Sequence, residues 1–359
     1  VIKIDALLEN DGEQLGGARR GADFQNLHRN KRAMTLNLKD PKGLEIFMRL
    51  AKKADVVVEN FRPDVKNKLG IDYESVRQIN PRIVYGSISG FGQDGPYHKR
   101  PGFDQIAQGM GGLMSITGAP GGGPMRVGIP VADLTAGLFC AMGILTALLE
   151  REISGEGQWV QTSLLQAQIF MLDFQASRWL MEKEVAKQVG NDHPTSIPTG
   201  VFKTSDGFIN IATAGGRIWE RCAHALGAPD LPKRPEYATA PDRSKNRKAL
   251  NAEIDKLTEK KSTDTWVKEM NEAGVPCGPI YSIDQTFDDA QVKHLDIAQD
   301  VPNAENRHIR LVGQPVRLSR TPSKMAAPPP EFGEQTDEVL AEFGFSVGEI
   351  EELRKAKVV

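Results

Sequence analysis

Short apolar runs and longer amphipathic stretches follow one another along the chain, as they do in proteins with parallel sheets flanked by helices. Pro41 opens an amphipathic stretch that reaches Lys53, and residues 55–60 then carry an almost wholly apolar run, which is typical of a buried parallel strand. The same order returns with a helical pattern over 73–79 and a strand pattern over 83–89. The repeat predicts an α/β fold with a doubly wound sheet.

A long, strongly apolar helix is predicted over residues 134–151. Small residues recur along it at spacings that leave one face flat enough for close packing against another helix: Ala136, Gly137, Ala141 and Gly143. We therefore expect this helix to be buried. The segment before it, 109–128, is crowded with Gly and Pro and predicts an irregular surface loop.

The pattern changes near residue 194. Residues 159–184 are helical in pattern, whereas 199–211 predict a hairpin around Ser205-Asp206-Gly207, and 217–226 predict an amphipathic helix. A last helical region is expected over 336–357. We predict a large domain from residues 1–190 and 301–359 and a smaller α+β domain from 191–300. Because the first five residues already have the pattern of a strand, we expect part of the large domain to precede them.

Composition narrows the class of protein. The 359 residues are 40% hydrophobic, which is enough for a real core, and there is no uninterrupted apolar stretch of the roughly 18 residues needed to span a bilayer. The N-terminus has no signal-peptide pattern, so we expect a cytoplasmic protein without a membrane partner. The three cysteines form no CxxC pair and the six histidines show no metal-ligand spacing, so we expect neither a disulfide framework nor a metal site.

Charge is unevenly distributed. The net charge is −2, yet residues 19–68 carry thirteen Lys and Arg against six Asp and Glu. No recognition-helix or aromatic-interleaved pattern accompanies these charges, so a phosphorylated small ligand is favoured over nucleic acid. The basic residues nearest to turns and strand ends suit a ligand with several separate phosphates, such as coenzyme A: Lys31, Arg32, Lys39, Arg62, Lys68 and Arg100.

Asp133 stands directly before the long apolar helix. Its simplest role is that of an N-cap that accepts backbone N–H groups. The same position would hold an ionised carboxylate at the positive end of a helix, beside glycine-rich backbone, as nucleophilic acyl chemistry requires. Other chemistries lack their motifs, because Gly86-Ser87-Ile88-Ser89-Gly90 fails the Gly-x-Ser-x-Gly spacing and Gly109-Met110-Gly111 lacks the third glycine of a dinucleotide fingerprint.

Several blocks, in order, resemble the family III CoA-transferases, which include formyl-CoA and carnitine CoA-transferases and the related α-methylacyl-CoA racemases. The blocks are Asn30-Lys31-Arg32 with Leu36 and Lys39, residues 54–63, 89–96 and 100–104, Asp133 with its helix, and residues 274–279 and 333–340. The resemblance spans nearly the whole chain.

This resemblance implies a Rossmann-like large domain built from both chain ends, a small inserted domain, and an interlocked, ring-like homodimer. It also implies an enzyme that moves CoA from an acyl-CoA donor to a carboxylic acid through Asp133, by way of aspartyl anhydride and aspartyl-CoA thioester intermediates. CoA is then a substrate, and no permanently bound cofactor is expected. The residues that match the family's CoA contacts are Leu36, Lys39, Asn60, Phe61, Arg62, Lys68, Arg100 and Asp104.

Two alternatives stay open from the sequence. The racemase branch uses a histidine base at the position of Phe103, and phenylalanine cannot exchange a proton, which favours a transferase. A non-catalytic CoA-binding protein would need Asp133 only as a helix cap. Ala6 stands where formyl-CoA transferase has a CoA-binding arginine, so the resemblance does not by itself imply formate and oxalate specificity. The sequence does not identify the donor or acceptor acid.

Overall fold

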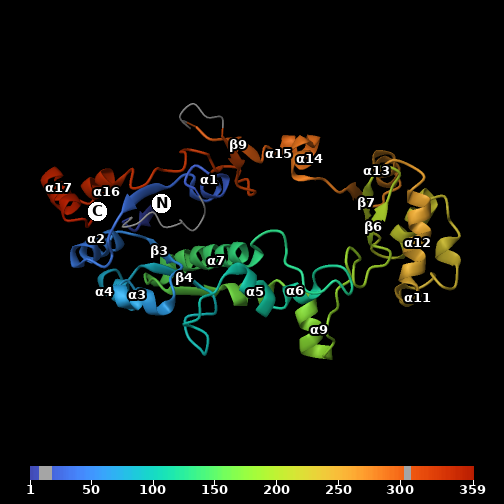
Figure 1. The fold of residues 1–359 in the computed structure, drawn as a ribbon, viewed down its shortest axis with the longest axis horizontal. Helices are drawn as coiled ribbons and strands as arrows, with labels where there is room; N and C mark the ends of the chain where they lie inside the picture. The colour runs from blue at the N-terminus through green and yellow to red at the C-terminus, as the bar shows by residue number, and fades with distance from the viewer. Residues whose placement is uncertain (8–17, 303–308) are drawn as a thin grey trace. The chain divides into compact units, whose positions relative to one another are not determined.

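The computed structural model describes residues 1–7, 18–302 and 309–359 (Figure 1). The chain divides into two compact units, of which unit 1 comprises residues 1–107, 132–167 and 286–359. Its elements are β1 (Ile2–Asp5), α1 (Ala22–His28), β2 (Arg32–Thr35), α2 (Pro41–Ala51), β3 (Val56–Glu59), α3 (Pro63–Leu69), α4 (Tyr73–Ile79), β4 (Val84–Ser89), α7 (Val131–Ser154), β5 (Trp159–Ser163), α15 (Ala290–Leu295), β9 (Ala298–Asp300), β10 (Arg310–Val312), α16 (Thr336–Glu342) and α17 (Val347–Lys355). Helix α7 begins with one residue, Val131, of the other unit, and three more helices cross the division along the chain: α5 (Asp104–Met110), α8 (Leu164–Phe170) and α14 (Ile283–Asp288).

The strands of unit 1 are mainly parallel. β1 pairs with β2, and β3, β4 and β5 form a second sheet in that order, with Val56 opposite Val84 and Tyr85 opposite Trp159. The predicted α/β alternation over residues 41–89 is therefore confirmed. The helical prediction is wrong for 159–163, where the chain adds β5 to the edge of β4. Val160 and Thr162 are β-branched and suit a pleated strand, and this local preference outweighs the helical spacing of the residues that follow.

Helix α2 begins as its sequence predicts. Pro41 occupies the first turn and the Asp40 carboxylate accepts a hydrogen bond from the Lys42 N–H at 2.8 Å. The helix buries Ile46 and Phe47 in the core of unit 1, which also contains side chains from α16 and α17. Figure 1 shows these C-terminal helices near α2. The C-terminal helices thus complete a core begun near the N-terminus.

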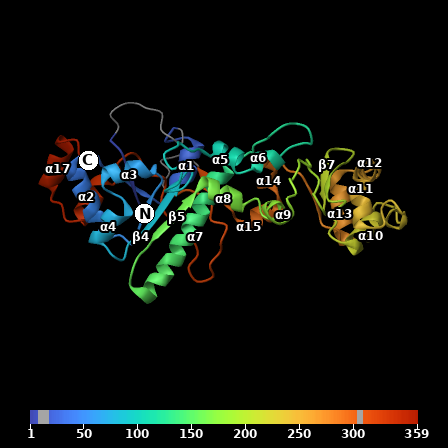
Figure 2. The ribbon, with the colours of Figure 1, turned by 90° about the horizontal axis from the view of Figure 1, so that it is seen from below.

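Helix α7 lies along β4 and β5 (Figure 2) and touches them through glycine. A Cβ on Gly143 would approach the Val160 Cγ1 to 2.6 Å, so this contact requires the absence of a side chain, and one on Gly86 of β4 would approach the Ile144 Cδ1 to 2.9 Å, so that side chain would have to shift. The opposite face carries a row of exposed apolar side chains, called here the α7 stripe: Leu134, Leu138, Met142, Leu145, Leu149 and Ile153. The expectation of a buried helix is wrong for the single chain, because only one side of α7 meets the sheet.

By length and composition α7 could also cross a membrane, and no other helix among the described residues could. Core helices of soluble proteins meet the same two criteria, so this finding is weak evidence for a membrane span.

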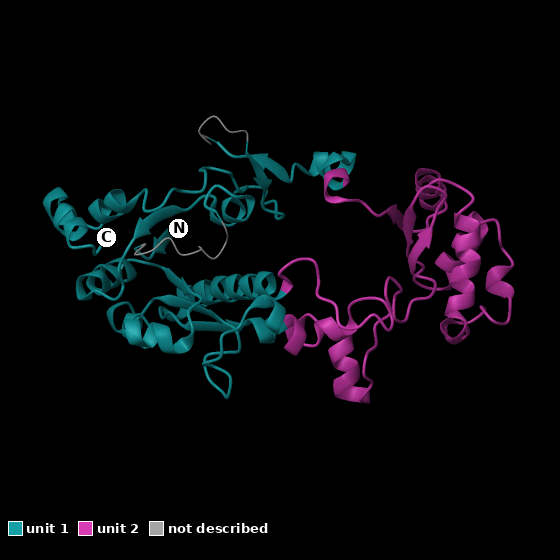
Figure 3. Cartoon of the chain, viewed as in Figure 1, with its two compact units in different colours: residues 1–107, 132–167, 286–359 teal, residues 108–131, 168–285 magenta. Residues whose placement is uncertain are grey.

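Unit 2 comprises residues 108–131 and 168–285 (Figure 3). It contains α6 (Leu113–Ile116), α9 (Phe174–Glu182), β6 (Gly200–Lys203), β7 (Phe208–Ile211), α10 (Gly216–Ala225), a 3₁₀ turn (Leu231–Lys233), α11 (Ala240–Lys245), α12 (Arg247–Thr258), α13 (Thr263–Glu272) and β8 (Cys277–Pro279). β6, β7 and β8 form an antiparallel sheet, which confirms the predicted hairpin. Trp219 and Trp266 are the largest side chains of its core.

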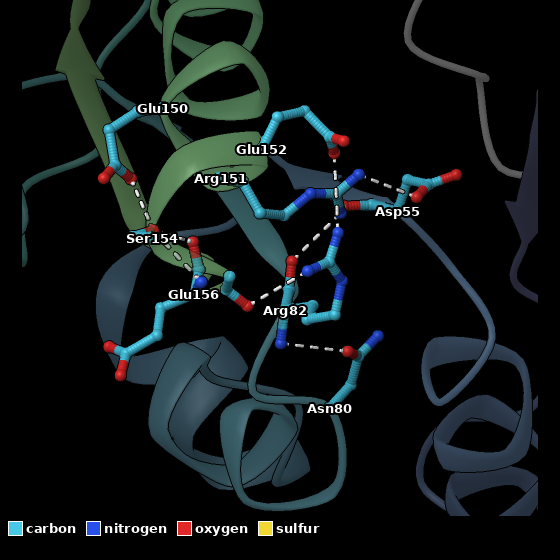
Figure 4. A network of polar contacts seen from close by, with 9 residues as sticks. Asp55, Asn80, Arg82, Glu150, Arg151, Glu152, Ser154 and Glu156 are labelled. Carbon is cyan, nitrogen blue, oxygen red and sulfur yellow. Dashed lines mark hydrogen bonds and ion pairs between the residues drawn. The ribbon is translucent and has the colours of Figure 1, made fainter.

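One buried arginine joins the end of α7 to the starts of β3 and β4 (Figure 4). The Arg151 side chain is 9% exposed, and its guanidinium donates to the Arg82 carbonyl at 3.0 Å and to the Asp55 carboxylate at 2.9 Å. The neighbouring pair of Arg82 and Glu152, at 3.4 Å, lies on the surface. The Asp55 side chain is itself 78% exposed, so the hydrogen bond from the buried Arg151 guanidinium to the Arg82 carbonyl, rather than either ion pair, holds this corner together.

We expect Arg151→Met to lower the free energy of unfolding by about 1–3 kcal/mol, because it leaves the Arg82 carbonyl, just before β4, without its buried donor. Urea unfolding followed by circular dichroism would measure the change. The control Glu152→Ala removes only an exposed charge and should change stability by less than about 0.5 kcal/mol. Equal losses in the two variants would contradict the assigned role of Arg151.

Candidate active site

The carboxylate of Asp104 caps the N-terminal end of α7. Its Oδ1 accepts from the Ala132 N–H at 2.9 Å and lies 3.4 Å from the Asp133 nitrogen, which also donates to it. Asp104 is buried, whereas Asp133 is the third residue of the helix and is exposed. The interpretation of Asp133 as the N-cap is therefore wrong, because a residue from another segment satisfies these backbone donors.

The Asp133 carboxylate remains available for chemistry. No residue within 1–7, 18–302 or 309–359 donates a recorded hydrogen bond to it. Partial desolvation raises the pKa of Asp133, and the negative charge of Asp104 raises this pKa further. A carboxylate with a raised pKa is more basic, and therefore a stronger nucleophile, wherever it is still ionised.

A cavity of about 460 Å³ brings together two of the lysines predicted to bind CoA, Lys39 and Lys68. Apolar side chains form most of the rest of its wall, and the full lining is Leu38, Lys39, Asp40, Pro41, Leu44, Val65, Lys68 and Leu69. The cavity thus combines an apolar surface with two ammonium groups. Lys68 also lies 3.6 Å from the Asp64 carboxylate, with its own side chain 78% exposed.

Other predicted contacts follow the carboxyl ends of parallel strands, where open α/β sheets bind ligands. Asn60, Phe61 and Arg62 come directly after β3, and all three are exposed. Leu36 comes directly after β2, but its side chain is 1% exposed and packs in the core of unit 1. Only the main chain of Leu36 could therefore meet a ligand.

Two further predicted residues flank Phe103. Arg100 is exposed, and its guanidinium stacks 3.8 Å from the centroid of the Tyr97 ring, while Asp104 points to the start of α7 as described above. Phe103 is itself 63% exposed and directly precedes α5. An exposed aromatic side chain supplies no proton-transfer group at this position.

Sequence reasoning missed two features of this region. It did not identify Asp104 as the cap of α7, because a cap supplied from outside the helix leaves no signature at the helix start. It also did not single out Lys66, whose ammonium lies buried against the Glu59 carboxylate at 2.8 Å. No group of three or more possible ligands that could hold a metal ion occurs in the part of the chain that the structure describes.

Comparison with known proteins identifies the family. The sequence model described as CoA-transferase family III matches residues 1–336. The chain belongs to this family. As a family III protein it is an enzyme, since its relatives are named CoA-transferases.

Two named enzymes and one solved structure show how similar the chain is to known proteins. The chain is 38% identical over 341 residues to the succinate–glutarate CoA-transferase of Agrobacterium fabrum, covering 92% of this chain and 82% of that protein. It is 34% identical over 354 residues to the succinyl-CoA:mesaconate CoA-transferase of Haloarcula marismortui, covering 97% and 88%. A solved structure described as a CAIB/BAIF family protein from Brucella suis superposes with a TM-score of 0.81 at 32% identity, covering 95% and 91%. The mixed α/β fold is therefore shared with this group.

The pKa of Asp133 in this family III enzyme should lie above that of an ordinary aspartate. It can be measured by ¹³C NMR of protein labelled at the aspartate carboxyl carbons, with Asp133→Asn used to assign the signal. In Asp104→Asn the amide oxygen can still cap α7 but the negative charge is gone, so the midpoint should fall. An unchanged midpoint would exclude the charge of Asp104 as a cause.

Proposed function

We propose that this enzyme transfers CoA from an acyl-CoA to a carboxylic acid, with Asp133 as the covalent nucleophile. The observation that carries the proposal is that two carboxylates at the start of α7 have different roles. Asp104 accepts the backbone hydrogen bonds, and the exposed Asp133 carboxylate keeps its lone pairs for a substrate. The positive end of the helix dipole also favours negative charge that develops beside it.

The reaction proceeds in four balanced steps. The Asp133 carboxylate attacks the thioester carbonyl, which forms a mixed anhydride and releases the CoA thiolate. The thiolate attacks the aspartyl carbonyl, which forms an aspartyl-CoA thioester and frees the donor acid. The acceptor carboxylate attacks that thioester and forms a second anhydride with renewed release of thiolate. Finally, the thiolate attacks the acceptor's carbonyl, which yields the new acyl-CoA and regenerates Asp133.

The cavity beside α2 and α3 is proposed as the site of the nucleotide end of CoA. Lys39 and Lys68 supply two positive charges for a phosphate, and the leucines of the wall offer an apolar surface for a base. Asn60, Phe61 and Arg62 follow on the next strand end and suit the pantetheine arm and its phosphates.

Short dicarboxylic acids are the proposed substrates. The names of three relatives pair succinate or succinyl-CoA with glutarate, mesaconate or citramalate, and all of these acids are dicarboxylic. We propose succinyl-CoA as a donor on this basis, with a small dicarboxylate as the acceptor.

Neither alternative function gains support. A racemase would need a base near the position of Phe103, and this side chain has none. A purely CoA-binding protein would use Asp133 as the helix cap, and that task falls to Asp104.

We propose further that the enzyme works as a homodimer. The α7 stripe leaves apolar side chains such as Leu138, Met142 and Leu149 exposed on one continuous helix face. Contiguous apolar surface of this kind marks an interaction site on a soluble protein, and a second copy of the chain could cover it.

Hydroxylamine added during turnover with succinyl-CoA should convert Asp133 to its hydroxamate, because both the anhydride and the aspartyl thioester react with this amine. Peptide mass spectrometry would locate the product. Asp133→Ala should give no label and no transfer while still binding CoA. Label at another residue, or none with any of a panel of acyl-CoA donors, would contradict the proposed mechanism.

Lys39→Ala and Lys68→Ala should each weaken CoA binding roughly tenfold, since each removes one charge-assisted phosphate contact. Isothermal titration calorimetry with CoA measures the effect. The control Lys42→Ala removes a lysine of α2 that does not line the cavity and should leave the affinity unchanged. Unchanged affinity in both cavity variants would exclude this cavity as the CoA site.

A further inference from the structure

A single buried ammonium group connects the segments that follow β3 and β4. Lys66 lies in α3 with a side chain only 2% exposed, and its Nζ donates to the Glu59 Oε1 at 2.8 Å, the Ser87 Oγ at 2.9 Å and the Gln93 Oε1 at 2.6 Å. An ammonium has three hydrogens to donate, so these three acceptors satisfy it completely. A fully buried lysine is rare in proteins and is stable only when it is paired in this way.

The three acceptors come from β3, from within β4 and from the segment after β4. Glu59 is the last residue of β3, and its second oxygen, Oε2, accepts from the Phe61 N–H at 2.8 Å. Gln93 lies in the segment after β4, where the Ser89 hydroxyl also accepts from the Gly92 N–H at 3.0 Å. Lys66 therefore fixes the turn at residues 60–62 through Glu59 and the segment 90–93 through Gln93.

Aromatic side chains enclose the ammonium on its other sides. Its Nζ lies 4.9 Å from the centroid of the Trp159 ring and 5.9 Å from that of Tyr85, and the Trp159 Nε1 donates to the same Ser87 Oγ at 2.8 Å. Ring faces attract a cation, and their bulk keeps water away from it. The hydrogen bonds from Lys66 are therefore strong and geometrically restricted.

We propose that Lys66 is a positioning residue for CoA binding: it acts through Glu59 and Gln93 to hold the two strand-end segments in the conformation that receives CoA. This inference rests on the proposed function, because it gives residues 60–62 a CoA contact. The Lys66 side chain is only 2% exposed and its ammonium is fully engaged, so its effect must pass through the segments that it holds.

The test compares Lys66→Met with wild type and with Lys52→Met, which changes an exposed lysine after α2. Direct titration with CoA should show an affinity about tenfold lower in Lys66→Met, and steady-state kinetics should show a KM for succinyl-CoA raised by about the same factor. The KM for the acceptor acid and the value of kcat should change less than about threefold. Lys52→Met should match wild type in every measurement.

A purely structural role would give a different result. Loss of folded enzyme lowers the apparent kcat but leaves both KM values unchanged, since the remaining molecules bind normally. That outcome, or an unchanged CoA affinity in a folded Lys66→Met, would overturn the proposal.

A second variant keeps the test valid if Lys66→Met does not fold. Lys66→Met leaves the Glu59 carboxylate buried without its countercharge, which can unfold a protein. The double variant Lys66→Met/Glu59→Gln removes both charges and keeps the size of both side chains, and it should show the same selective rise in the KM for succinyl-CoA because the links to Ser87 and Gln93 are still lost. A normal CoA affinity in this double variant would likewise overturn the proposal.

The two proposals fail in distinguishable ways. If wild type binds CoA but transfers it to no acid, the proposed function is wrong, and the loss of CoA affinity in Lys66→Met still supports the role of Lys66. If wild type does not bind CoA, both proposals are overturned.

Discussion

The hydrogen bonds from the first amides of α7 to the Asp104 carboxylate determine what the start of this helix can do. A helix of 24 residues has a strong positive end and unpaired N–H groups that must be satisfied. Had Asp133 satisfied them, its carboxylate would be engaged in local structure. Because Asp104 comes from a separate segment, the helix is capped while a second carboxylate, that of Asp133 in the first turn, stays exposed. Asp104 thus stabilises the helix, and Asp133 is left available to react.

The carboxyl edges of the parallel strands provide the second constraint. Lys39 follows β2, Asn60 follows β3 and Gln93 follows β4, so residues distant in sequence reach the same kind of location in the fold. Side chains at such an edge are not needed for core packing, and the main chain beside them is exposed, so both can contact a ligand. The buried Lys66 adds rigidity where loops alone would allow several conformations. A ligand that meets pre-positioned segments loses less conformational entropy on binding.

Much of this could be predicted from the sequence, wherever the signal is local. Pro41 and the apolar periodicity after it determine α2, and the valines of 56–58 determine β3, because these preferences depend only on neighbours in the chain. Lys39 and Lys68 could be chosen because they lie beside turns and match a known family. Their meeting in one cavity depends on how α2 and α3 pack, which spacing alone does not reveal.

The features that escaped prediction depend on tertiary contacts. Lys66 has the sequence context of an ordinary surface lysine on a short helix, and only its three acceptors from β3, β4 and the following segment explain its burial. The small residues of α7 indicated close packing correctly for Ala136 and Gly143, but wrongly for Gly137, which has nothing within 4 Å of an added Cβ, and for the exposed Ala141. They also could not reveal that the partner of Gly143 is Val160 of a strand rather than a second helix. The expectation that α7 is buried was wrong for a related reason. Hydrophobicity predicts that a helix face will be covered, but it does not tell whether the same chain covers it.

The electrostatics at the start of α7 link stability and reactivity. Partial desolvation raises the pKa of Asp133, and repulsion by the Asp104 carboxylate at the same helix end raises it further. A raised folded-state pKa means that ionised Asp133 is less favourable in the fold than in the unfolded chain, so its ionisation lowers stability as pH rises through that pKa. The same ionisation creates the nucleophile, so stability decreases over the pH range in which reactivity appears. The positive helix end limits this cost because it favours both negative charges, and the cap supplied by Asp104 lets the helix tolerate a reactive acid in its first turn.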